Sequence, residues 1–292
     1  MATTLAYRAY AKINLYLDVV KKRRDGYHNI ETIFQSVGLA DELSFSEERS
    51  QISLSCSMPE LATSDQNLVM RAANLLRART GCTAGVRIEL TKNIPIAAGL
   101  AGGSTDAAAA LVALNRLWEL GLNRPQLHQL ATELGSDVPY CITGGTMAAT
   151  RRGEDLQSLT PLPLTWFVLI HPDVTVSTAR IYASPRLSFT SEKPFAGRTP
   201  AFRRAIRRLA DGDVAGVLFN RMEGAVFADR PHLAELKDRL VEAGCTNAAM
   251  SGSGATVFGV CASRRDARRV AEAFSDCRTT IVSSVPASIE QI

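Results

Sequence analysis

PIAAGLAGGSTDAAAALVALN, residues 95–115, joins a glycine-rich loop to a long alanine- and leucine-rich run. Gly99, Gly102 and Gly103 permit backbone conformations in which N–H groups turn toward a ligand. Ser104 is predicted to cap the helix that follows, whose leucines recur at helical spacing. Because the N–H groups at a helix N-terminus and the helix dipole both attract anions, this segment predicts a phosphate site.

Neither common nucleotide motif explains this loop. A Walker loop has Lys after its last glycine, where this chain has Ser104, and the dinucleotide motif needs a Gly-x-Gly-x-x-Gly spacing that is absent here. A glycine turn before a buried helix remains the alternative. Three glycines, a cap and the acidic Asp106 near the positive end of the helix together favour phosphate binding.

Composition limits the classes of function. The chain has 292 residues, enough for two modest domains, with 46% hydrophobic and 21% charged residues and a net charge of +4. This charge does not suggest a nucleic-acid partner. Six cysteines without a Cys-x-x-Cys pair indicate a reducing compartment, and no apolar run is long enough for a membrane span. We therefore expect a cytoplasmic protein with no nucleic-acid or membrane partner.

The first half of the chain predicts antiparallel strands backed by helices. Residues 7–20 alternate as a strand does, and Asp25-Gly26 predicts a hairpin turn into residues 29–37. An acidic turn is expected at Asp41-Glu42. Further elements are predicted as strands over 43–45, 51–56, 86–90 and 146–151, and as helices over 68–79 and 125–134.

The second half predicts a separate unit of split βαβ type. Two prolines within residues 159–163 place the boundary there, which gives domains 1–160 and 161–292. Residues 183–200 are expected to form a mobile loop. Strands are predicted over 166–171 and 279–283 and on both sides of a glycine turn in 248–260; helices are predicted over 200–209, 214–225, 231–243 and 264–274.

Several polar residues outside the glycine loop stand out, each with two interpretations. Lys12 and Asn14 share one face of the first strand, where they either face solvent or address one ligand. Tyr27 and His28 follow the hairpin turn and either pack or form a stacking surface. Asp137 precedes Val-Pro and is either a helix cap or a functional acid.

Three motifs carry a resemblance to a known superfamily. AKINLYLDVVKKRRDGYH (11–28), PIAAGLAGGSTDAA (95–108) and MSGSGATVFG (250–259) are similar, in order and spacing, to those of the galactokinase, homoserine kinase, mevalonate kinase and phosphomevalonate kinase superfamily. Within it, KINL at 12–15, DGYH at 25–28 and GSDVP at 135–139 resemble the 4-diphosphocytidyl-2-C-methyl-D-erythritol kinases. The resemblance covers nearly the whole chain.

The resemblance implies an α+β fold of two domains with the active site in the cleft between them. The first domain would hold a mixed or antiparallel sheet with helices, and the second a ferredoxin-like split βαβ unit. The implied reaction transfers the γ-phosphate of ATP, with Mg²⁺, to the 2-hydroxyl of the cytidyl substrate, a step in non-mevalonate isoprenoid precursor synthesis. A monomer or weak homodimer is expected, and the sequence offers no dedicated carboxylate ligand for the metal.

The resemblance also assigns roles by position. It implies a catalytic pair, Lys12 and Asp137, and a cytosine held between Tyr27 and Tyr182. Around the cytidyl substrate it places Asn14, Tyr27, His28, Thr178 and Tyr182. Around ATP it places Asn67, Lys92, Pro95, Ile96, Ala97, Ala98, Gly99, Leu100, Ala101, Gly102, Gly103, Ser104 and Thr105.

Two departures from the family pattern are small: Ala101 and Thr105 replace residues that are often Gly and Ser. The first is expected to stiffen the loop, and the second keeps a hydroxyl. Two other functions remain open, namely a related kinase that acts on a small alcohol such as homoserine or mevalonate, and a nucleotide-binding module without catalysis.

Overall fold

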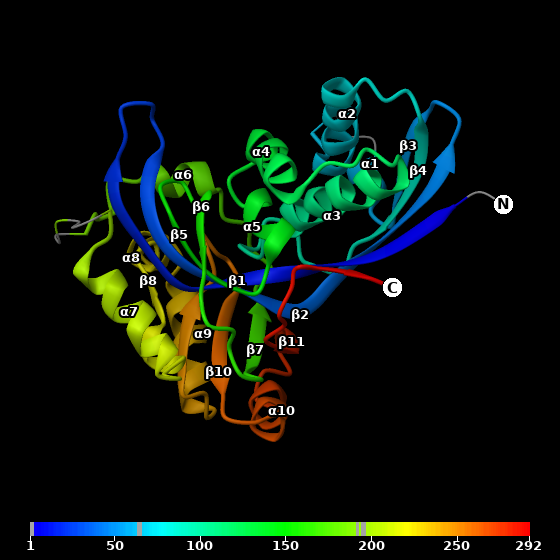
Figure 1. Cartoon of the computed structure of the whole chain (residues 1–292). Coiled ribbons are helices and arrows are strands. Elements are labelled where there is room, and N and C mark those ends of the chain that lie inside the picture. Colours follow the sequence, from blue (N-terminus) through cyan, green and yellow to red (C-terminus); the bar gives the residue numbers. More distant parts are fainter. Residues whose placement is uncertain (1–2, 63–65, 191–192, 194–196) are drawn as a thin grey trace.

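A long hairpin of β1 (Thr4–Lys22) and β2 (His28–Glu48) runs through the whole molecule (Figure 1). The computed structural model describes residues 3–62, 66–190, 193 and 197–292. The hairpin is the centre of a sheet with the strand order β12-β1-β2-β4-β3. In the same sheet, β5 pairs with β2 and β6, and β8 pairs with β1. The other strands are β3 (Ile52–Cys56), β4 (Gly85–Thr91), β5 (Thr146–Thr150), β6 (Asp155–Ser158), β8 (Phe219–Asn220) and β12 (Ile289–Gln291).

Five helices lie together on one side of this hairpin (Figure 1): α1 (Pro59–Ala62), α2 (Leu68–Thr80), α3 (Gly102–Leu117), α4 (Arg124–Leu134) and α5 (Val138–Thr143). The sequence predicts α2 and α4 with nearly these bounds. The Asn67 side chain caps α2 by accepting a hydrogen bond from the Val69 backbone, at 2.9 Å. Gly81 ends α2 in the left-handed conformation, which glycine adopts without steric cost.

A second, four-stranded antiparallel sheet has the order β11-β7-β10-β9. Its strands are β7 (Trp166–His171), β9 (Asn247–Met250), β10 (Val257–Cys261) and β11 (Arg278–Ser283). The helices that connect them are α6 (Thr178–Tyr182), α7 (Pro200–Ala210), α8 (Glu223–Asp229), α9 (Pro231–Glu242) and α10 (Arg264–Glu272), with a 3₁₀ turn at Ala215–Val217. In chain order the strands alternate with helices in the βαββαβ pattern, which confirms the predicted split βαβ unit.

Three apolar clusters make up the interior. One lies between α2–α5 and the first sheet, and a second joins the helices of the second half to its sheet. The third contains side chains of both sheets and of the glycine loop, among them Ile13, Leu100 and Phe258. The first sheet also contains β8 and β12, which come from the second half of the chain. The domain boundary at residue 160 stays a prediction.

Three predicted features are wrong. Asp41-Glu42 forms no turn, because β2 continues through it with Glu42 paired to Thr91. Ser104 is no helix cap, since α3 already begins at Gly102. The helix expected over 214–225 is interrupted by β8, which pairs with β1.

Of the loop expected at 183–200, residues 191–192 and 194–196 lie outside the described residues. In the part of the chain that is described, no helix has the length and apolar character needed to cross a membrane.

Candidate active site

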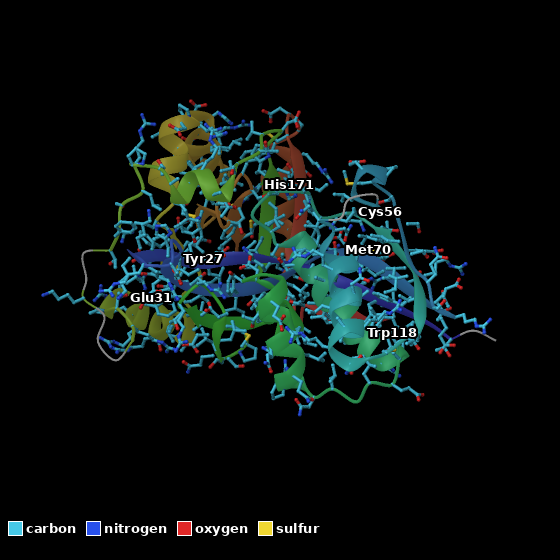
Figure 2. All side chains as sticks on the ribbon, turned by 90° about the horizontal axis from the view of Figure 1, so that it is seen from above. Tyr27, Glu31, Cys56, Met70, Trp118 and His171 are labelled. Carbon is cyan, nitrogen blue, oxygen red and sulfur yellow. The ribbon has the colours of Figure 1, made fainter. Side chains whose placement is uncertain are left out.

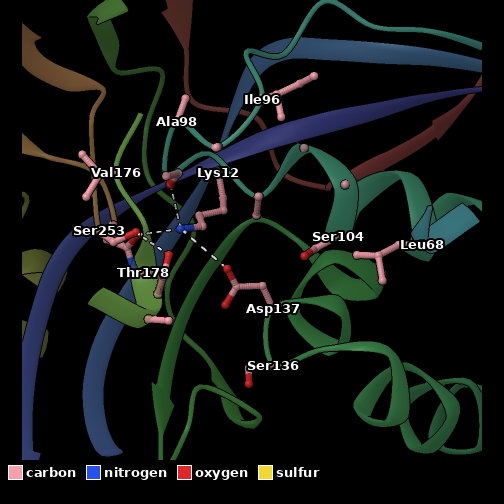
Figure 3. A pocket seen from close by; sticks show the side chains of 18 of the residues that line it. Lys12, Leu68, Ile96, Ala98, Ser104, Ser136, Asp137, Val176, Thr178 and Ser253 are labelled. Carbon is pink, nitrogen blue, oxygen red and sulfur yellow. Dashed lines mark hydrogen bonds and ion pairs between the residues drawn. The ribbon is translucent and has the colours of Figure 1, made fainter. Parts of the chain in front are cut away.

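The predicted motifs meet around one cavity of about 910 Å³. Figure 3 shows Lys12 at its centre, with Asp137 and Ser104 on one side and Thr178 and Ser253 on the other. From the glycine loop the cavity is lined by Pro95, Ile96, Ala97, Ala98, Gly99, Ala101, Gly102, Gly103 and Ser104. The predicted site residues outside the loop all line it too: Lys12, Asn14, Tyr27, His28, Asn67, Lys92, Asp137, Thr178 and Tyr182.

Two predicted residues of the glycine loop turn away from the cavity. Leu100 is packed in the apolar cluster between the sheets, and the Thr105 hydroxyl is buried inside the first domain. Ala101 adopts a left-handed φ of 59° immediately before α3. Glycine tolerates this conformation better than alanine does, which is a physical reason why the family often has glycine there. The first amides of α3 have no intrahelical acceptor, and Gly102, Gly103 and Ser104 line the cavity.

Lys12 is a buried cation with defined partners. Its Nζ donates to Asn14 Oδ1 at 2.7 Å and to the Gly99 carbonyl at 2.9 Å, and it lies 3.8 Å from Asp137 Oδ2. Burial lowers the pKa of Lys12, whereas the charge of Asp137 opposes this shift. Since an ammonium has three N–H groups, two are used by fixed acceptors and the third is left for the side of Asp137.

Asp137 precedes α5, but in the described chain its side chain makes no capping hydrogen bond to that helix. The predicted cap interpretation is therefore wrong. The carboxyl is 34% exposed and faces the Lys12 ammonium across the cavity (Figure 3). A carboxylate held near a buried cation and open to a ligand is arranged to exchange a proton with that ligand.

Both the oxygen and the nitrogen of the Asn14 side-chain amide are hydrogen-bonded to other side chains. Its Oδ1 accepts from Lys12, and its Nδ2 donates to Thr32 Oγ1 at 2.8 Å. Thr32 in turn donates to the Tyr16 carbonyl at 2.6 Å. The amide therefore orients Lys12 in addition to lining the cavity.

Lys92 belongs to a buried ion cluster beneath the glycine loop. Its Nζ contacts a carboxylate oxygen of Asp41 and lies 2.7 Å from Asp106 Oδ2. Burial disfavours the ammonium, but the charges of Asp106 and Asp41 outweigh it and raise the pKa of Lys92. Lys92 thus fixes the floor of the predicted ATP site, and Asn67, whose amide caps α2, forms part of its wall.

Aromatic side chains gather at the hairpin end of the cavity. The His28 and Tyr182 rings stack with their centroids 4.7 Å apart, and Phe189 lies 5.8 Å from His28. Tyr27 is 55% exposed, with the Arg152 guanidinium 5.0 Å from its ring centre. In Figure 2 Tyr27 lies on the opposite side of the molecule from Trp118 and Cys56. The ring stacked on Tyr182 is that of His28.

Sequence reasoning missed several residues of the cavity. Thr178 Oγ1 lies 2.7 Å from Ser253 Oγ, which brings α6 against the glycine turn between β9 and β10. The sequence indicates a glycine turn that permits close backbone approach in MSGSG, but it assigns none of these residues to the site. Lys22, Ser136 and Arg152 also line the cavity. Lys22 and Ser136 lie in motifs that carry the resemblance, but neither is assigned a role by it, and Arg152 lies in none of those motifs.

Comparisons with known proteins place the chain in a family. The model of the GHMP kinase N-terminal domain matches residues 67–145, and that of the GHMP kinase C-terminal domain matches residues 193–277. A homoserine kinase from Cytophaga hutchinsonii is 18% identical, with a TM-score of 0.73 over 99% of this chain and 97% of its own, and shares the fold.

Much closer relatives carry one name. The 4-diphosphocytidyl-2-C-methyl-D-erythritol kinase of Pelotomaculum thermopropionicum is 47% identical over 90% of this chain and 91% of its own. That of Geobacter metallireducens is 39% identical over 98% and 99%. A crystal structure of a 4-(cytidine 5'-diphospho)-2C-methyl-D-erythritol kinase has a TM-score of 0.81 at 34% identity, over 96% of this chain and 98% of its own. The chain therefore belongs to the 4-diphosphocytidyl-2-C-methyl-D-erythritol kinase family of the GHMP kinases.

Proposed function

We propose that this chain transfers the γ-phosphate of ATP to the 2-hydroxyl of 4-diphosphocytidyl-2-C-methyl-D-erythritol, a step in non-mevalonate isoprenoid precursor synthesis. The observation that carries the mechanism is the pair of Lys12 and Asp137, 3.8 Å apart between the glycine loop and the aromatic cluster. Phosphoryl transfer depends on positioning and on neutralising charge more than on covalent chemistry. This cavity provides both.

Each end of the cavity suits one substrate. The open amides at the start of α3 would bind the β- and γ-phosphates of ATP. The cytosine would stack on the aromatic cluster of Tyr27, His28 and Tyr182, whose rings offer flat apolar faces. Burial lowers the pKa of His28, so its neutral imidazole can both donate and accept a hydrogen bond at the edge of the base.

In the reaction, Asp137 would accept the proton of the attacking 2-hydroxyl. The third N–H of Lys12 would stabilise the charge on the transferring phosphoryl group. The new P–O bond forms as the bond to the β-phosphate oxygen breaks, and ADP leaves with that electron pair. Lys12 would thus stabilise negative charge on the phosphoryl group, while Asp137 would accept the proton of the hydroxyl.

The oxygen-bearing side chains at the start of α3 fit Mg²⁺. Asp106 Oδ1 is buried with no hydrogen-bond partner in the described chain, and Asp106 and Ser104 both line the cavity. No cluster of three metal-ligating His, Cys, Asp or Glu residues occurs among the described residues, but Mg²⁺ typically takes only one or two carboxylates besides phosphates and water. Ser104 and Asp106 would hold the ion, which when bound neutralises charge on the phosphates.

A substrate panel tests the function. ADP production is measured with the cytidyl substrate, mevalonate and homoserine, and turnover is expected only with the first. Asp137→Asn should lower kcat by about 10²–10⁴-fold with the fold intact, because it removes the proton acceptor. Asp155→Asn, the same change on an exposed carboxyl outside the cavity, should retain full activity. Near-normal turnover of Asp137→Asn would exclude it as the base.

A further inference from the structure

One carbonyl oxygen links the two halves of the chain at the active site. The Gly99 carbonyl accepts a hydrogen bond from Lys12 Nζ at 2.9 Å and a second from Ser251 Oγ at 2.9 Å. Ser251 is fully buried, and it follows β9 in the second sheet. A hydroxyl from the second half of the chain is thus only one atom removed from the catalytic ammonium.

The backbones at this contact approach too closely for side chains to intervene. A Cβ added to Gly99, whose φ is +77°, would lie 2.1 Å from the Ser251 carbonyl oxygen. A Cβ on Gly252 would lie 3.1 Å from the Gly99 carbonyl oxygen and 3.4 Å from Lys12 Nζ. The glycines therefore serve to bring turn 251–254 against the loop and the lysine.

Further hydrogen bonds fix the backbone of turn 251–254. The Asn220 amide donates to the Met250 and Gly252 carbonyls, both at 2.7 Å, and accepts from the Met222 backbone at 2.9 Å. A backbone hydrogen bond from Thr256 to the Ala98 carbonyl, at 3.3 Å, adds a second tie to the glycine loop. These bonds fix the backbone that carries the Ser251 hydroxyl, the donor to the Gly99 carbonyl.

We infer that Ser251 is a positioning residue for phosphoryl transfer: it fixes the Gly99 carbonyl, which orients the Lys12 ammonium toward the reacting groups. The ammonium can rotate about its bond to Cε, so its direction is set by its acceptors. Asn14 supplies one and Gly99 the other. Without the Ser251 hydroxyl the second acceptor is less constrained, and the N–H that faces Asp137 loses its alignment. This inference rests on the function proposed above.

Ser251→Ala is the direct test, measured as kcat and KM for both substrates. We expect kcat to fall by roughly ten- to a hundredfold, the scale at which small misplacements act, while both KM values stay within about threefold. Ser251→Cys, similar in size with a weaker donor, should give an intermediate kcat. Ser263→Ala is the matched control: it removes the cap of α10 far from the cavity and should lower thermal stability but not kcat.

A double-mutant cycle with Lys12→Met separates positioning from a general structural role. If Ser251 acts through Lys12, adding Ser251→Ala to Lys12→Met should cause no further loss of the residual turnover. An equal loss in both backgrounds, or unchanged kcat in Ser251→Ala, would overturn the inference. These outcomes differ from failure of the proposed function, in which the wild-type chain itself would not turn over the cytidyl substrate.

Discussion

At Asp41, a single carboxylate supports the strand end that leads into the glycine loop. Its Oδ1 accepts from the Asn93 and Ile94 backbones at 2.6 and 2.8 Å, and Lys92 contacts its other oxygen. Asp41→Ala should therefore lower the free energy of unfolding by about 3–5 kcal/mol, because it leaves a buried ammonium and two backbone amides short of an acceptor. Urea denaturation monitored by circular dichroism measures this loss.

The neighbouring residue is a matched control. Glu42 pairs with Arg8 at 3.3 Å, but these side chains are 49% and 44% exposed. Glu42→Ala should cost less than about 1 kcal/mol, since water and salt screen such pairs. Comparable losses for the two variants would contradict the burial argument for Asp41.

The same residues show how far the sequence can predict a site. Lys12 and Asp137 can be predicted as a pair because the resemblance assigns both positions, and the structure brings them within 3.8 Å. Asp41 was misinterpreted as a turn residue because its partners lie about fifty positions further along the chain. Ser251 lies in the motif 250–259, but the motif does not reveal its role, since its hydroxyl donates to a carbonyl 152 residues away. Contacts between distant segments depend on the packed fold, and local patterns do not reveal them.

At the scale of elements, β7 carries a buried histidine that makes stability depend on pH. His171 bonds the Thr280 and Thr256 hydroxyls at 3.0 and 3.3 Å, and burial, with Arg278 nearby, lowers its pKa to about 4. Between pH 6.5 and 4 the unfolded chain binds a proton that the folded chain does not. The stability that His171 contributes is therefore complete above pH 6.5 and falls as the pH drops to 4.

Comparing His171→Gln with the wild type tests this. The wild-type free energy of unfolding should fall across that window by up to about 3 kcal/mol more than that of the variant. His232→Gln, on the exposed face of α9, should follow the wild-type curve. Parallel curves for wild type and His171→Gln would show that the histidine is not the titrating group.

The bounds of an element can be predicted where the local spacing of apolar residues determines its type. They cannot be predicted where pairing with a distant strand determines it. Strands β1, β7 and β10 and helices α2, α4 and α9 have close to their expected bounds. The segment 214–225 has helical spacing, yet Phe219 and Asn220 form a strand against Tyr16 and Leu17 of β1. That choice depends on a partner strand two hundred residues earlier, which the spacing of apolar residues does not reveal.

At the scale of the whole molecule, the two halves share one interior. The cluster between the sheets includes Ile13 on β1, Leu100 in the glycine loop, and Phe167 and Phe258 in the second sheet. Separating the halves would expose these buried side chains, at a cost of about 25 cal/mol for each Å² of apolar surface. The hairpin β1–β2 also extends through both halves (Figure 1), so the active site lies on a continuous structure.

We therefore expect one cooperative unfolding transition, with a calorimetric enthalpy equal to the van't Hoff enthalpy. A non-hydrolysable ATP analogue, which would bind in the first half, should shift that single transition as a whole, because ligand binding to the folded state stabilises every part that unfolds with it. Phe258→Ala, which opens the shared cluster from the second sheet, should lower the melting temperature without splitting the peak. Two resolved peaks in the wild type, only one of them moved by the nucleotide, would mean that the halves unfold independently and that the shared cluster does not couple them.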